Sequence, residues 1–157
     1  MSALLRWGTD MRLDAEEARR RFLTAPSVRL ATVRPDGTPH LVPITFAACA
    51  RDTLVFAVDH KPKSTQRLAR LANIAAHPAV CLLADEWSAD WPRLWWARAD
   101  GRAVEIAADD PRRPTALAAL SARYPQYREQ PPAGPVVWID VHTWTGWSGS
   151  NSVDLRA

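Results

Sequence analysis

The sequence predicts an α+β fold in which an antiparallel sheet or barrel carries helices at its ends. Strand-like runs outnumber helical ones along the 157 residues, and most neighbouring strands are separated only by short turns. No strand is followed by a GxGxxG motif, and the sequence contains no phosphate-binding P-loop. These observations favour antiparallel pairing and argue against a Rossmann fold.

The first predicted element is a helix over 14–25. Asp14 is a residue type that caps helix N-termini, and Glu16 and Glu17 stand in the first turn with arginines after them, as the helix dipole favours. Pro26 cannot continue the helix. We therefore expect a short helix that ends where the first strand begins.

Three strands are predicted next, as a meander. The runs "SVRLATVR" and "PHLVPITFAA" are expected to pair across the turn "PDGT", where Gly37 is free to take a positive φ. Pro39 and Pro43 suit an edge strand, because proline cannot donate to the ladder of a central one. The run "TLVFAV" predicts the third strand.

The second half of the chain alternates helices and strands. A helix is predicted from about Ser64 to Ala75, with Leu68, Leu71 and Ile74 at helical spacing. The run "AVCLLAD" is apolar enough to predict a strand buried on both sides, and "RLWWARADGRAVEIA" predicts a long strand or bent hairpin. The predicted single domain spans 1–157, with helices over 14–25 and 111–123, strands roughly over 27–106 and 135–142, and a turn-rich tail over 143–157.

Composition narrows the class of protein. The start "MSALLRWGTDMRLD" lacks the apolar core of a signal peptide and no apolar run is long enough to cross a membrane, which predicts a cytoplasmic protein without a membrane span. Cys49 and Cys81 have no metal or redox spacing and are expected to be buried thiols. The net charge of +3 is mild and its excess is local, so nucleic-acid binding ranks low.

The only two lysines of the chain, Lys61 and Lys63, flank Pro62 just before the second predicted helix. Proline keeps the preceding residue extended, and in an extended segment Asp59, Lys61 and Lys63 share one face. A helix N-terminus beside two ammonium groups is suited to a phosphate or carboxylate, which the fork of Arg67 can also reach. No acidic residue occurs from 60 to 84. The alternative is an ordinary solvated surface.

The stretches "RLATVRPDGTPHLVPITFA" and "TLVFAVDHKPKSTQRLARLANIAAHPAVCLLAD" resemble the split-barrel flavin- and deazaflavin-binding family related to pyridoxamine 5'-phosphate oxidase. Within that family they are most similar to the actinobacterial branch that uses coenzyme F420. The similarity runs from about 28 to 104, with a weaker echo at "VVWIDVHTWTGWS". It implies a six-stranded antiparallel split β-barrel with flanking helices, the FMN-binding split barrel.

The resemblance also implies a homodimer with two cofactor sites between the protomers. By this similarity the cofactor ring lies against the backbone of Pro43, Ile44 and Thr45. By the same similarity the cofactor phosphate is bound by Lys61, Lys63, Ser64 and Thr65, with Arg67 beside them. The lysines and Arg67 also belong to the anion site inferred above from the sequence. Arg70 and the acid-free window suit the more anionic coenzyme F420, although FMN could use the same cradle.

Tryptophans and histidines leave several interpretations open. Four of the eight tryptophans fall at 87–96. They can pack in the core, form a dimer interface, or make an aromatic wall for the cofactor ring or a flat substrate. Trp95 and Trp96 are strand neighbours, so only one of them can line the pocket; we assign Trp96, with Trp147 from the C-terminal end. The four histidines have no ligand spacing, so no metal is predicted. His40 is a surface residue or a proton donor.

The leading functional prediction is a coenzyme F420-dependent oxidoreductase that transfers hydride between the reduced deazaflavin and a small organic acceptor. One alternative is an FMN-binding flavoprotein of the pyridoxamine 5'-phosphate oxidase type. Another is a cofactor-binding or carrier protein without turnover. Because the cofactor supplies the chemistry in such proteins, no catalytic triad or catalytic residue is predicted.

Overall fold

The computed structural model describes residues 11–58 and 66–150. Its elements follow in chain order: β1 (Arg12–Leu13), α1 (Ala15–Thr24), β2 (Val28–Val33), β3 (Pro39–Ile44), β4 (Ala47–Ala50), β5 (Thr53–Ala57), α2 (Gln66–Ala76), β6 (Ala79–Glu86), a 3-10 turn (Trp91–Arg93), β7 (Trp95–Ile106), α3 (Arg113–Arg123), α4 (Pro125–Glu129) and β8 (Val136–Ser148). The predicted α+β class is confirmed.

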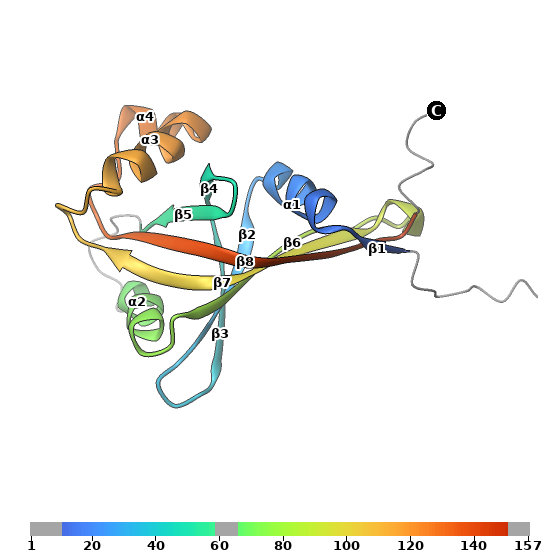
Figure 1. Ribbon diagram of the computed structural model, residues 1–157, viewed down its shortest axis with the longest axis horizontal. Helices are drawn as coiled ribbons and strands as arrows, with labels where there is room; N and C mark the ends of the chain where they lie inside the picture. The colour runs from blue at the N-terminus through green and yellow to red at the C-terminus, as the bar shows by residue number, and fades with distance from the viewer. Residues whose placement is uncertain (1–10, 59–65, 151–157) are drawn as a thin grey trace, which may run out of the picture.

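One antiparallel sheet holds all the described strands, in the order β3-β2-β6-β7-β8-β5-β4 with β1 added beside β8. Figure 1 shows β7 and β8 running side by side across the molecule, with α3 and α4 at one end and β1 at the other. The terminal strands β3 and β4 are joined by only Thr45 and Phe46. The sheet is therefore rolled into a barrel whose ends meet at this corner.

The first elements are where the local sequence patterns predicted them. Asp14 caps α1, since its carboxylate accepts the Glu17 amide at 2.8 Å. Gly37 takes a φ of 87° in the turn between β2 and β3. β3 lies at one edge of the sheet, as its two prolines predicted.

The structure corrects the sequence prediction in four places. The sheet has eight strands rather than six, because "PHLVPITFAA" breaks at the corner into β3 and β4, and β1 pairs with β8. β6 alternates buried and exposed residues and is not covered on both sides. β8 continues to Ser148 instead of ending at 142, so the predicted tail is strand through that residue. The short helix α4 was not predicted.

The core lies inside the rolled sheet, under α1 and α2. Phe22 of α1 contacts Phe46 edge to face with ring centroids 5.2 Å apart, and Trp144 of β8 at the same distance. Leu71 and Ile74 of α2 are buried in the same cluster. A second cluster under α3 packs Ala116 and Leu120 against β5 and β8. None of the helices in the described part of the chain is long and apolar enough to span a membrane.

Candidate functional site

The corner between β3 and β4 is held by a tyrosine from the other end of the chain. Tyr124, where α3 ends, accepts the Phe46 amide N–H at 3.0 Å and donates its hydroxyl to the Phe46 carbonyl at 2.8 Å. The Arg123 guanidinium lies 4.3 Å from the centre of the Phe46 ring. A chain that turns between two strands leaves backbone groups without ladder partners, and Tyr124 satisfies both of these. The corner is therefore a fixed point of the fold.

The three residues assigned to the cofactor ring lie at this corner. The Ile44 side chain is buried in the core, while Pro43 and Thr45 are exposed. Thr45 Oγ1 lies 3.4 Å from the hydroxyl of Tyr127 in α4. Because β3 ends the strand order, its second edge is not covered by another described strand. The segment therefore presents its backbone rather than the Ile44 side chain.

Of the residues assigned to the cofactor site, Asp59, Lys61, Lys63, Ser64 and Thr65 lie outside the described residues, as does the side chain of Arg67. The chain on both sides of that segment is described. Val58 donates its amide to the Pro135 carbonyl at 2.9 Å, and α2 begins at Gln66. A pocket of about 280 Å³ lies beside Val58 and is also lined by Tyr127. This volume is below the ~300–1,000 Å³ typical of ligand pockets.

A polar network lies between α2 and the β2–β3 hairpin. Asn73 of α2 donates to the Thr32 hydroxyl at 3.0 Å, and both residues are 2% exposed. The Thr32 hydroxyl also lies 3.4 Å from His40 Nδ1. Burial lowers the pKa of His40, and the charges of Arg34 and Arg70 lower it further. His40 is therefore a neutral imidazole at pH 7, close to the basic side chain of Arg70.

Trp96 and Trp147 are brought together, but away from the corner. They are direct partners across β7 and β8 and lie on the face of the sheet that also carries Arg29, Leu41 and Leu83; we call this the outer face. Pro43 belongs to the same face three strands away, which is roughly 14 Å at the usual strand spacing. One chain alone does not place Trp96 or Trp147 against Pro43–Thr45.

The outer face carries apolar side chains around Leu41. Leu41 is 66% exposed, and a shallow pocket of about 410 Å³ is lined by Leu41, Leu83 and Trp96. Arg29 and Arg98 also line this pocket, and each pairs with a carboxylate: Arg29 with Asp85 at 2.5 Å and Arg98 with Asp100 at 2.9 Å. An exposed leucine beside a leucine and a tryptophan makes this area a candidate contact surface.

The tryptophans do not form one wall. Trp95 faces the opposite side of the sheet from Trp96, as strand alternation predicted, and Trp144 packs on Phe22 and donates its indole N–H to Asp52 at 2.8 Å. Trp144 and Trp147 are three positions apart in β8 and face opposite sides of the sheet, so they do not line the same surface. Trp87 and Trp91 are 80% and 59% exposed, so neither is a core residue.

Sequence reasoning missed Tyr124 and Tyr127. Both lie at the corner, but they come from a stretch about 80 residues after it, in and beside the unpredicted α4. The run "RYPQYRE" contains no local signal that would connect it to β3. Within the part of the chain that the structure describes, no group of three His, Cys, Asp or Glu side chains is arranged to hold a metal ion.

Comparisons with known proteins agree with this architecture. Among solved structures, a conserved hypothetical protein of Mycobacterium tuberculosis superposes with a TM-score of 0.71 at 18% identity, covering 96% of this chain and 93% of that one. A FAD-binding protein of Mesorhizobium loti has a TM-score of 0.65 at 20% identity, covering 86% and 93%. A heme-binding protein of Mycobacterium smegmatis has a TM-score of 0.64 at 22% identity, covering 88% of this chain and 55% of that one.

These identities establish a shared fold, an antiparallel split barrel with flanking helices. The search of curated proteins gave no match. The family model for pyridoxamine 5'-phosphate oxidase matches residues 15–148, a range that begins in α1 and ends with β8 and so contains the whole barrel apart from β1. By fold and by sequence, the chain belongs to the pyridoxamine 5'-phosphate oxidase family.

Proposed function

We propose that this protein is an oxidoreductase that binds coenzyme F420 at the β3–β4 corner and transfers hydride between the deazaflavin and a small organic acceptor. The observation that carries the proposal is the position of Val58 and of α2, which flank the lysine segment in the sequence. Val58 lies beside a pocket that is also lined by Tyr127, whose hydroxyl is 3.4 Å from Thr45 Oγ1 at the corner, and α2 begins at Gln66. This supports an anion site on the segment that follows Val58, near the exposed backbone of the corner.

The charge of this region favours an anionic cofactor. The sequence places Lys61, Lys63 and Arg67 at and before the start of α2, and Arg70 follows one turn later, beside His40. The helix N-terminus adds its own preference for anions. Coenzyme F420 carries a phosphate and an acidic tail, so a run of basic residues beyond the phosphate position suits it.

The chain supplies binding and orientation, while the hydride comes from the cofactor. The backbone of Pro43–Thr45 would lie against the ring, and the buried Ile44 side chain and the Tyr124 bonds to Phe46 fix that backbone in place. His40, neutral at pH 7, is suited to accept a hydrogen bond rather than to act as a cation.

We also propose that the working form is a homodimer with the outer face at the interface. The outer face carries the two tryptophans assigned to the cofactor site, and one chain does not bring them to the corner. A second copy packed on this face would bury Leu41 and could bring its Trp96 and Trp147 toward the corner of the first. Each site would then need both copies.

A second candidate function is FMN-dependent oxidation or reduction. The family match and the likeness to a FAD-binding protein favour a flavin. The third, a carrier without turnover, is favoured by the likeness to a heme-binding protein. Both use the same barrel, so the cofactor and the turnover must be measured.

Titration of the purified protein with coenzyme F420 and, separately, with FMN decides between the branches. We expect tighter binding of F420, followed by acceptor-dependent oxidation of the reduced form. Tighter binding of FMN would move the protein to the flavin branch. Binding without turnover over a panel of electrophilic acceptors would support the carrier function, and no binding of either compound would overturn the proposal.

A further inference from the structure

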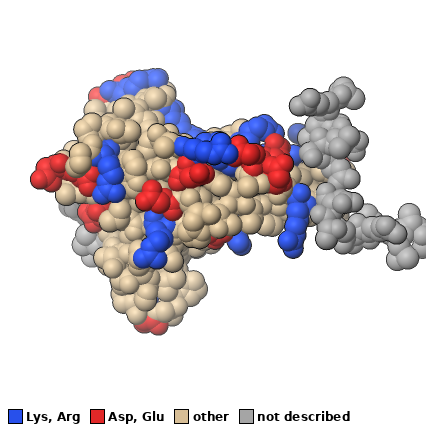
Figure 2. Space-filling view, viewed as in Figure 1, with Lys and Arg blue, Asp and Glu red and all other residues tan. Residues whose placement is uncertain are grey.

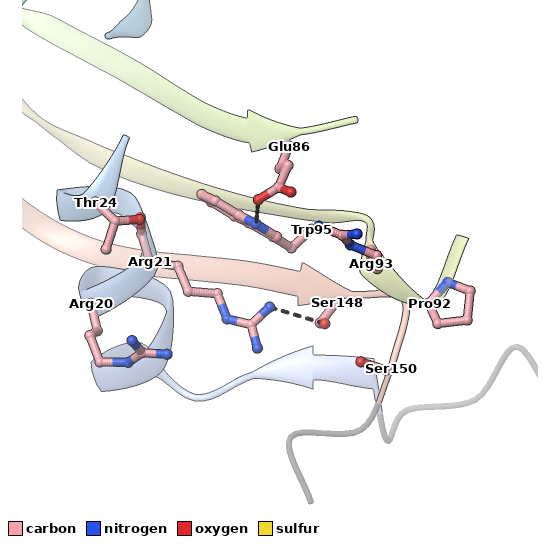
Figure 3. A pocket seen from close by; sticks show the side chains of 9 residues that line it. All are labelled: Arg20, Arg21, Thr24, Glu86, Pro92, Arg93, Trp95, Ser148 and Ser150. Atoms are coloured by element: carbon pink, nitrogen blue, oxygen red, sulfur yellow. Dashed lines mark hydrogen bonds between the residues drawn. The ribbon is translucent and has the colours of Figure 1, made fainter. Parts of the chain in front are cut away.

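A second concave site lies on the side of the sheet opposite Trp96. A pocket of about 520 Å³ opens between the C-terminal half of α1 and the ends of β6, β7 and β8. We call it the arginine pocket; its defining residues are Arg20, Arg21, Glu86, Arg93, Trp95 and Ser148. Its volume is in the range of sites for small molecules. Figure 3 shows the Arg21 guanidinium reaching from α1 toward Ser148, with the Trp95 indole alongside.

Arg21 is a buried cation held in a fixed position. The residue is 8% exposed, its Nε donates to Glu17 at 2.6 Å, and its Nη1 donates to the Ser148 hydroxyl at 3.1 Å. Burying a guanidinium is costly unless it is paired, and these bonds supply the partners. The group is therefore pre-oriented on the wall of a cavity, where an incoming anion would not have to order it.

The pocket has an excess of positive charge. Arg20 and Arg21 both pair with Glu17, with Nη2 of Arg20 at 2.7 Å and Nε of Arg21 at 2.6 Å from the carboxylate. Glu86 is engaged by the indole N–H of Trp95 at 3.0 Å. Arg93 enters none of the ion pairs found among residues 11–58 and 66–150. Three guanidinium groups thus face two carboxylates, and one further negative charge would balance them.

The rest of the wall is flat, apolar and rigid. The bond to Glu86 fixes the plane of the Trp95 indole. The 3-10 turn that carries Pro92 and Arg93 is bonded to the end of β8, because Gly149 donates its amide to the Leu94 carbonyl at 2.7 Å. A Cβ at Gly149 would lie 2.0 Å from the Trp91 carbonyl oxygen, so only glycine allows this approach. Arg93 is therefore placed beside the indole by the backbone itself.

We propose that the arginine pocket binds a small aromatic carboxylate. The carboxylate would sit on Arg21 and Arg93, whose planar forks match its two oxygens, and the ring would stack along Trp95. A single negative charge matches the excess of one, and the indole and Pro92 cover a flat apolar body. This ligand site does not use the corner or the outer face.

Benzoate and its uncharged analogue benzamide are the matched probes. The readout is the indole N–H resonance of Trp95 in the ¹⁵N-labelled full chain, assigned with Trp95→Phe and followed at constant ionic strength. We expect benzoate to shift this resonance with a dissociation constant on the order of 1 mM, as its small size implies, and benzamide at least about tenfold more weakly.

Arg93→Gln and Arg102→Gln separate the pocket from general charge effects. Both residues are exposed, and only Arg93 lines the pocket. Arg93→Gln should weaken benzoate about tenfold or more without lowering the melting temperature, since a lost charged contact has that effect, while Arg102→Gln should leave the affinity unchanged. Equal responses to benzoate and benzamide, no saturable shift, or unchanged affinity in Arg93→Gln would overturn the proposal.

Discussion

At the scale of single residues, Cys81 shows how surroundings decide reactivity. Burial raises the pKa of its thiol to about 11, and the neighbouring Asp100 carboxylate contributes to the rise. Since the thiolate is the reactive form, we expect iodoacetamide to modify Cys81 at pH 8 on the order of a hundredfold more slowly than a free cysteine. Mass spectrometry of the alkylated peptides measures this rate; modification as fast as that of a free thiol would contradict the assigned environment.

Glu17, in the first turn of α1, pairs with Arg20 and Arg21 of the same helix. Hydrogen bonds and charge from Arg20 outweigh the desolvation that opposes them, and with Arg21 they lower the pKa of Glu17 to about 2. A lowered pKa means that the stabilisation is present above the unfolded value of 4.5 and is lost as the pH falls toward about 2. Glu17→Gln should therefore be less stable at neutral pH and less sensitive to acid in that window.

We expect Glu17→Gln to lose about 1–3 kcal/mol at pH 7, because the buried Arg21 would keep no carboxylate on its Nε. Glu16→Gln on the same helix is the control. Glu16 pairs with Arg51 at an exposed position, where ion pairs contribute ~0–1 kcal/mol. Urea unfolding at pH 7 and at pH 3 compares the two; equal losses in both variants would refute the role of Glu17.

At the scale of elements, what the sequence could predict depended on distance along the chain. The Asp14 cap, the Gly37 turn and the spacing of Leu71 and Ile74 are local patterns, and the corresponding elements formed where expected. The break at Thr45–Phe46 was not local, because Tyr124 stabilises it from 78 residues away. The pattern of apolar residues in "PHLVPITFAA" contains no signal that would identify Tyr124 as the partner.

The end of β8 was missed because its glycines suggested turns. Gly146 is instead a strand residue in a crowded place, since a Cβ there would lie 2.9 Å from both Leu13 Cδ1 and the Trp96 carbonyl oxygen. Strand β1 covers this end, and β7 pairs with it through Ser148. Glycine in this strand thus allows a neighbouring strand to approach closely. A single sequence does not distinguish such a glycine from one in a turn.

Gly101 stands at the irregularity between β7 and β8, where the register shifts after Asp100. A Cβ on Gly101 would lie 2.5 Å from the Asp140 carbonyl oxygen, so Gly101→Ala must displace paired backbone. We expect a loss of about 2 kcal/mol or more by urea unfolding. Gly37→Ala is the comparison: it meets nothing within 4 Å and should cost only about 1 kcal/mol for its positive φ. The reverse order would show that the β7–β8 contact is not tight.

At the scale of the whole molecule, the candidate site could be only partly predicted. The lysine segment and the ring-contact strand follow from the sequence and its resemblance, but the apolar outer face became visible only in three dimensions. Figure 2 shows basic side chains interspersed with acidic ones on the face viewed, without a large patch of one sign. Residues that meet only across an interface between two chains have no characteristic spacing in the sequence of one chain, so a single sequence does not reveal them.

The homodimer can be tested on the outer face. Leu41→Lys places a charge at a 66% exposed position of the proposed interface and should convert the dimer to a monomer. Val104→Lys, at a 44% exposed position eight residues along β7 from Trp96 and outside the pocket that contains Leu41, should leave the dimer intact. Sedimentation equilibrium separates the two outcomes. A wild-type monomer, or dissociation in both variants, would contradict an interface on the outer face.

The most direct test of the central claim is the affinity for coenzyme F420 of a Lys61→Ala plus Lys63→Ala variant. A matched control, Arg51→Ala plus Arg102→Ala, removes the same charge from exposed positions elsewhere. We predict that the lysine variant binds more than about a hundredfold more weakly than the wild type, because two charged contacts to the phosphate are lost, while the control binds as the wild type does. Unchanged affinity in the lysine variant, or an equal loss in the control, would contradict the assignment of the cofactor site.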